Sequence, residues 1–160
     1  MSLQVDVMTA MKAAMKAKDQ TALAALRAVK AEILLAQTAT GSKEEISEDE
    51  EIKILSKMVK QRKDSAAIFL EQDRNDLAEP ELAQAEIISQ FLPVQLSEEE
   101  IAEEVVKTIA EVGAEGMKDM GKVMGMVSKA LAGKADGKTI SSIVKAKLSI
   151  RLYLKVNAIA

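Results

Sequence analysis

The residues that most directly suggest chemistry run from Gly133 to Thr139, with the sequence GKADGKT. The segment ends in Gly-Lys-Thr, as does the loop that wraps the phosphates of ATP in P-loop proteins. That loop has four residues between its two glycines, whereas three residues separate Gly133 from Gly137. It also follows a buried strand, so that N–H groups at the start of the next helix converge on phosphate. Residues 119–131 instead have a helical pattern, and an ATP site is not predicted.

We interpret the same segment as the turn of a helix–turn–helix. Gly133 is expected to end the first helix, because glycine readily takes the left-handed conformation at a helix C-terminus. Asp136 and Gly137 are expected to form the turn, and Thr139 is expected to cap the following helix.

The formal net charge of −3 conceals a strong asymmetry along the chain. Residues 1–116 carry 13 basic and 23 acidic side chains, a net charge of −10. Residues 117–160 carry nine basic and two acidic side chains, a net charge of +7. A basic third on an acidic body indicates a polyanionic partner such as RNA, or else a solvated lysine-rich surface. Charge alone does not decide between these two interpretations.

A second basic cluster lies in the segment KILSKMVKQRK, within an expected helix. Its members are Lys57, Lys60, Arg62 and Lys63. They could contact RNA phosphates, pair with the acidic run of residues 44–51, or be solvated.

No residues are predicted to be catalytic, and no metal or cofactor site is predicted. The chain has no Cys and no His, which excludes disulfides, thiol nucleophiles, cysteine-based zinc sites and histidine bases. Most carboxylates stand at the expected helix starts, where the helix dipole favours them. Their spacing marks neither a metal site nor an acid–base pair.

Composition and pattern predict an all-α protein of two helical domains. Strong helix formers dominate, and the chain has only three aromatic residues. Pro93 disfavours helix at the preceding residue, so we place a boundary there. The predicted parts are an N-terminal helical domain over residues 1–93, a small three-helix domain over residues 94–149, and an extension over residues 150–160.

Apolar residues at spacings of three and four predict the individual helices. We expect helices over residues 3–17 and 20–38, from Ser47 to about residue 73, from Asp76 past Pro80, from Ser97 to about residue 112, over about 119–131, and from Thr139 to about residue 149. In the first helix, the predicted inward stripe consists of Val5, Met8, Met11 and Met15. The third helix is expected to end at Asn75 in a left-handed conformation. Residues 150–157 alternate apolar and polar, which is typical of a strand, although the last helix could also continue through them or the segment could be unattached.

The sequence contains neither a signal-peptide pattern nor an apolar run of membrane-spanning length. We therefore expect a cytoplasmic protein without a membrane partner.

Several segments together resemble the YqeY-like family, which is similar to the tail region of GatB, a subunit of the tRNA-dependent Asp/Glu amidotransferase. The resemblance covers roughly residues 3–149. Its segments are LRAVKAEI (26–33), KQRKDSAAIF (60–69), AEIISQFLPVQLSEEEI (85–101) and DMGKVMGMVSKALAGKADGKTISSIVKAKL (119–148).

The resemblance implies two helical domains and tRNA recognition by the C-terminal one. Family members are described as related to carbon–nitrogen ligases that use glutamine as amide donor, but nothing in this chain resembles the catalytic cradle of the amidotransferase. The family motif, together with the nearby Lys145, gives the predicted RNA-binding residues. These are Gly121, Lys122, Gly125, Lys129, Gly133, Lys134, Asp136, Gly137, Lys138 and Lys145.

Three functional hypotheses follow from the sequence. The first is a non-catalytic protein that binds tRNA or another structured RNA. The second is an accessory of an amidotransferase or aminoacyl-tRNA synthetase complex, and the third is a helical adaptor between proteins.

Overall fold

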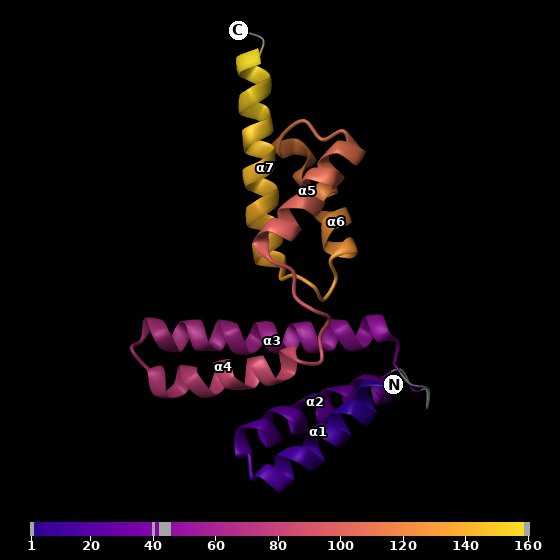
Figure 1. The fold of residues 1–160 in the computed structure, drawn as a ribbon, viewed down its shortest axis with the longest axis vertical. Helices are drawn as coiled ribbons and strands as arrows, with labels where there is room; N and C mark the ends of the chain where they lie inside the picture. The colour runs from indigo at the N-terminus through magenta and orange to yellow at the C-terminus, as the bar shows by residue number, and fades with distance from the viewer. Residues whose placement is uncertain (1, 40, 42–45, 159–160) are drawn as a thin grey trace. The chain divides into compact units, whose positions relative to one another are not determined.

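The computed structural model describes residues 2–39, 41 and 46–158, and over these residues it is all-α, as predicted. Its helices are α1 (Leu3–Ala17), α2 (Gln20–Ala39), α3 (Glu48–Glu71), α4 (Asn75–Ser89), α5 (Glu98–Val112), α6 (Met120–Ala130) and α7 (Gly137–Ala158), with a 3₁₀ turn, η1 (Met117–Asp119), before α6 (Figure 1). By its contacts the chain divides into two compact units, Met1–Pro93 and Val94–Ala160. No helix among the described residues has the length and apolar content to cross a membrane.

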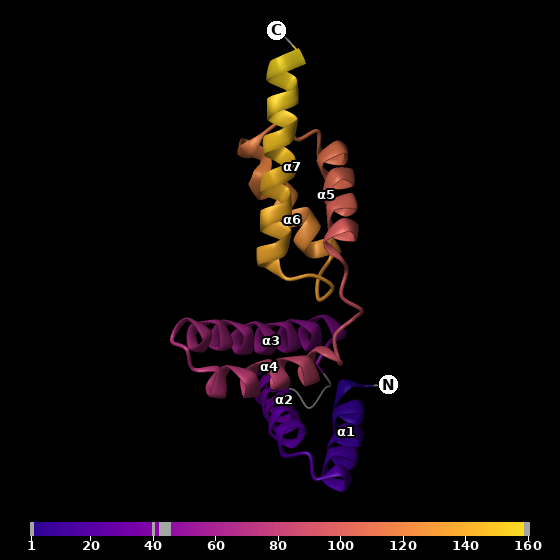
Figure 2. The same cartoon turned by 60° about the vertical axis from the view of Figure 1, so that its left-hand side comes forward.

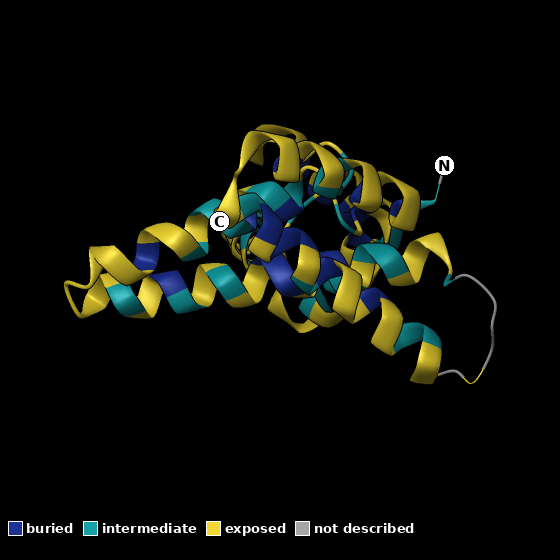
Figure 3. Cartoon of the chain, turned by 90° about the horizontal axis from the view of Figure 1, so that it is seen from below, coloured by how far each residue is buried: buried dark blue, intermediate teal, exposed yellow. Residues whose placement is uncertain are grey.

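The first unit consists of two helical hairpins, α1–α2 and α3–α4, with α2 packed against α3 and α4. Its core is aliphatic and includes Leu26, Val29, Leu55 and Ile88, all at most 2% exposed. The burial pattern in Figure 3 shows that the outer end of the α3–α4 hairpin is mostly exposed.

Helix α1 buries a different stripe from the one predicted. Leu3, Val7 and Ala14 are buried, whereas Val5 and Met15 are about half exposed. Both stripes are apolar, so spacing alone does not distinguish them. The buried one includes small alanines that let α1 lie close to α2.

The link between α3 and α4 also differs from the prediction. Asp73, with φ of 55°, takes the left-handed conformation that was expected at Asn75. Asn75 is instead the first residue of α4, and Pro80 lies inside that helix. The bidentate pair between Arg74 and Asp76, 2.8 Å at its closest, stabilises the turn and lowers the pKa of Asp76.

The second unit is a three-helix domain in which α5, α6 and α7 all contact one another (Figure 2). Its core is aliphatic and includes Val105, Val123, Val127, Val144 and Leu148, each completely buried. Ser97 and Glu100 make a reciprocal capping box at the start of α5, where the helix was expected to begin.

The final segment is helical, because α7 runs without interruption to Ala158. The strand interpretation of residues 150–157 is therefore wrong, and the alternative of a continued helix is confirmed. The end of α7 extends past α5 and α6 in both views (Figures 1 and 2). No strand exists among the described residues with which it could pair.

The α3–α4 hairpin generates a stability prediction. Ala66 on α3 and Ala78 on α4 are completely buried, so their small side chains let the helices approach closely. Ala66→Leu should lower the free energy of unfolding by about 1–3 kcal/mol, because the added methylenes must displace packed neighbours. Ala67→Leu is the matched control, since Ala67 is exposed. Urea denaturation measures both, and equal stability of the two variants would contradict this packing.

Candidate nucleic-acid interface

The turn between α6 and α7 is tied to the segment that precedes α5. Helix α6 ends at Ala130 with Leu131 as its C-cap, so Gly133 does not end the helix as predicted. Gly133 lies in the turn that follows, where its φ of 74° is a conformation that glycine adopts readily. Its carbonyl accepts a hydrogen bond of 2.6 Å from Gln95 Nε2. The Lys134 carbonyl accepts one of 2.8 Å from the Leu96 N–H. These two bonds fix the turn that carries Lys134.

Asp136 caps α7, a role that the sequence assigned to Thr139. The Asp136 carboxylate accepts a hydrogen bond of 3.0 Å from the Thr139 N–H and a second bond from the Thr139 hydroxyl. Helix α7 therefore begins at Gly137, two residues earlier than predicted. Because a carboxylate already occupies this helix N-terminus, and a turn rather than a strand precedes it, the segment is not built as an ATP phosphate loop.

Four predicted residues lie along one exposed face of α6. Gly121, Lys122, Gly125 and Lys129 are all exposed, and they lie opposite the buried Val123 and Val127. Their spacing of one, four and eight residues from Gly121 places them side by side on a helix. We call this surface the glycine–lysine face.

The fold does not require the two glycines of the glycine–lysine face. A Cβ added to Gly121 or Gly125 would meet nothing within 4 Å, and neither residue has positive φ. Glycine inside a helix costs about 1 kcal/mol relative to alanine. Neither packing nor backbone conformation explains that cost, whereas close approach of another molecule to the helix would.

The remaining predicted lysines follow the turn into α7. Lys134 is exposed in the turn, and Lys138 is exposed in the first turn of α7. Lys145 is also exposed, and it lies on the same side of α7 as Lys138 because the two are seven residues apart. The predicted lysines of the turn and of α7 are thus exposed, as are the residues of the glycine–lysine face on α6.

The two acidic residues of this basic third both accept hydrogen bonds from backbone N–H groups. Asp119 accepts a hydrogen bond of 2.8 Å from the Glu115 N–H, and this bond is the main cause of its lowered pKa. Asp136 accepts from Thr139. Both acidic groups therefore order the backbone beside the lysines. Among the described residues, no group of three or more acidic side chains could hold a metal ion.

The second basic cluster contains one residue with a structural role. Arg62 donates from Nε to the Gln84 side chain at 3.2 Å and from a terminal nitrogen to the Met58 carbonyl at 3.4 Å. It therefore links α3 to α4. Lys57, Lys60 and Lys63 are exposed, and none makes a salt bridge with another described residue. Part of the acidic run proposed as their partner, residues 44 and 45, lies outside the described residues.

Sequence reasoning missed the role of Gln95 and Leu96. Both lie in the segment AEIISQFLPVQLSEEEI, which the resemblance singled out without a function. Gln95 is a polar residue beside the predicted domain boundary, which is a sequence signal for a structural role. Its hydrogen-bond partner, Gly133, lies 38 residues away in the chain and is not indicated by the local sequence.

Comparisons with known proteins confirm the predicted resemblance to the YqeY-like family. The sequence pattern of the family described as Yqey-like protein matches residues 4–148. A relative from Clavispora lusitaniae, named altered inheritance of mitochondria protein 41, mitochondrial, is 40% identical over 116 residues, which cover 71% of this chain and 64% of the relative. A protein of the same name from Pyrenophora tritici-repentis is 32% identical over 154 residues, which cover 91% of this chain and 80% of that protein.

These names contradict the cytoplasmic location expected from the sequence. Both relatives are named as mitochondrial proteins. The expectation rested on sequence signals that were not found, whereas the names provide a positive indication. Neither name mentions an activity, an RNA or an amidotransferase.

The cap on α7 generates a second stability prediction. Asp136→Ala should lower the free energy of unfolding by about 1 kcal/mol, because the Thr139 N–H loses its acceptor. Asp136→Asn is the control, since it removes the charge but keeps an acceptor oxygen, and it should retain most of the stability. Thermal and urea denaturation compare the three proteins. An equal loss in both variants would assign the effect to charge instead of capping.

Proposed function

This chain belongs to the Yqey-like protein family, and we propose that it is a non-catalytic protein that binds tRNA or another structured RNA through its C-terminal unit. The observation that supports the proposal best is the glycine–lysine face, where two glycines without a role in packing stand beside exposed lysines. The same unit contains the basic turn at Gly133 and Lys134, which is anchored by Gln95 and Leu96.

The chemistry of this surface favours the sugar–phosphate backbone as the contacted part of the RNA. Lysines neutralise phosphates with little regard to base sequence. Glycines let a backbone approach the helix more closely than any other residue would allow. Recognition of single-stranded bases uses aromatic stacking, but Tyr153 is the only aromatic residue in Val94–Ala160. A folded RNA whose shape matches the surface is therefore the proposed ligand.

The names of the two relatives extend the proposal to location. We propose that this chain, like the proteins with those names, acts in mitochondria. Mitochondrial tRNA is accordingly the first RNA to test.

Charge reversal on the proposed surface tests the function. Fluorescence anisotropy with labelled tRNA should show binding that weakens with salt, because lysines displace counterions from phosphates. Lys122→Glu, Lys134→Glu and Lys138→Glu should each weaken binding and reduce the slope of log affinity against log salt by about 1. Lys12→Glu is the matched control, since it reverses an exposed lysine of α1 in the other unit. Affinity that is indifferent to the three reversals, or equally sensitive to the control, would contradict the proposal.

The glycines provide a test in which stability and binding move in opposite directions. Gly125→Ala should raise the free energy of unfolding by up to about 1 kcal/mol, because alanine favours helix and its methyl group enters open space. The same methyl group should lower the affinity for tRNA by holding the backbone away from the helix. Urea denaturation and anisotropy measure the two effects. A variant that is more stable and binds as well as the original protein would remove the role given to the glycines.

A further inference from the structure

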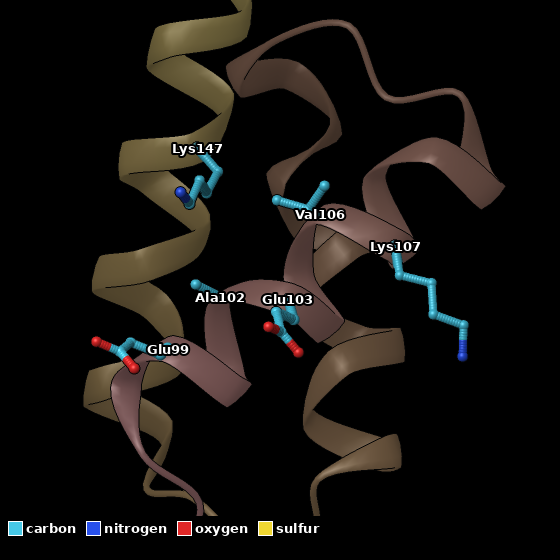
Figure 4. Close-up of a pocket in the computed structure, with 6 residues that line it drawn as sticks. All are labelled: Glu99, Ala102, Glu103, Val106, Lys107 and Lys147. Carbon is cyan, nitrogen blue, oxygen red and sulfur yellow. The ribbon is translucent and has the colours of Figure 1, made fainter.

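A groove lies between α5 and α7, on helices that also enclose the core of the second unit (Figure 4). The side chains that line it are Glu99, Ala102, Glu103, Val106, Lys107 and Lys147. Val106 is an apolar side chain of this groove and is 51% exposed. The α5 wall of the groove carries glutamates and the α7 wall carries Lys147.

The two helices that border the groove have opposite charges. Helix α5 contains six glutamates and one lysine, and α7 contains five basic residues and no acidic residue. Of the two lysines that line the groove, Lys107 pairs with Glu104 of its own helix at 3.9 Å. Glu99, Glu103 and Lys147 make no salt bridge with any described residue of the chain.

The apolar part of this surface continues along α7. Ile143, Ile150 and Leu154 share a side of the helix with Lys147, because the four are separated by four, three and four residues. Ile150 and Leu154 are 54% and 61% exposed. Ile150 and Leu154 of α7 thus add exposed apolar side chains to Val106 of α5. Both follow Leu148, the last buried residue of α7.

We propose that this groove is the interface of a homodimer, occupied by the same groove of a second copy of this chain. A two-fold axis places one surface against itself, so the surface must be complementary to itself. An acidic α5 beside a basic α7 meets that requirement, because the acidic helix of each copy can face the basic helix of the other. Val106, Ile150 and Leu154 would form the apolar centre, with the charged side chains around it.

The same charges argue against other occupants of the groove. RNA and an anionic bilayer both carry negative charge, and the glutamates of α5 would repel either one. A second copy uses both walls of the groove. The proposal is independent of RNA binding, which was assigned to α6, the turn and exposed lysines of α7.

Sedimentation velocity of the full chain tests the dimer over a range of concentrations. We expect a dimer whose fraction rises with concentration. Val106→Glu should convert it to monomer, because a carboxylate would be buried in the apolar centre without a partner. Met126→Glu is the matched control, since Met126 is 43% exposed on α6, and it should leave the dimer intact. Circular dichroism confirms that both variants are folded.

Charge reversals provide a second test that does not alter the apolar centre. Glu103→Lys and Lys147→Glu should each weaken the dimer by about tenfold or more, because like charges then face each other across the interface. The two changes combined in one chain should restore much of the affinity, since each copy then presents the opposite charges. Failure of the combination to restore the affinity would overturn the proposed pairing of α5 with α7.

Other outcomes would overturn the proposal as a whole. A chain that stays monomeric at every concentration and at low salt has no such interface. A dimer that survives Val106→Glu uses another surface. Binding of the monomer to vesicles of anionic phospholipid, or to tRNA, that Val106→Glu abolishes would assign the groove to that ligand. The tRNA measurements with Lys122→Glu are separate, so the dimer and RNA binding can fail independently.

Discussion

Burial of one aliphatic stripe on each helix is the constraint on which the second unit depends. Val105 on α5, Val127 on α6 and Val144 on α7 are completely buried, and they meet without help from a sheet or a disulfide. Burying an aliphatic side chain of this size contributes about 1.5–3 kcal/mol. Because one face of each helix maintains the fold, the other faces can vary without a large effect on stability. The exposed faces of this unit are therefore the natural place for features that the fold does not explain.

Two such features lie on different helices and have different chemistry. The glycine–lysine face of α6 combines exposed lysines with open space beside its two glycines, which suits a polyanion that approaches the helix backbone closely. The groove between α5 and α7 combines exposed apolar side chains with both signs of charge, which suits a protein surface of the same kind. If both proposals hold, a dimer would present two basic surfaces at once, and an RNA that reached both would bind more tightly than to either one.

The sequence predicts the core of the fold better than its ends. Spacings of three and four predicted the helices of the second unit, and each of α5, α6 and α7 buries one apolar stripe. Helix α1 has two such stripes, and the choice between them depends on packing against α2, which is not visible in local sequence. A helix start is also predictable from local sequence when both residues of a capping box are present, as at Ser97 and Glu100. It was misassigned at Thr139 because Asp136 competes for the same role three residues earlier.

The sequence proposes residues for the candidate site, but it does not predict their geometry. Charge asymmetry and the family resemblance selected the lysines and glycines, yet neither could distinguish a glycine needed for a turn, such as Gly133, from one that the fold does not need, such as Gly125. The alternation of residues 150–157 was misleading for a related reason. A helix that extends past its own domain has no buried side, so its sequence need not show a period of 3.6.

The hydrogen bonds from Gln95 and Leu96 to the turn have a consequence for dissecting this protein. They join residues 95 and 96 to residues 133 and 134, so the segment before α5 is held against the turn between α6 and α7. The compact unit therefore begins before its first helix. A fragment cut at Ser97 would keep every helix of the unit but would release the Gly133 and Lys134 carbonyls from their donors. A fragment that begins at Val94 keeps both bonds, and its basic turn would remain held as it is in the whole chain.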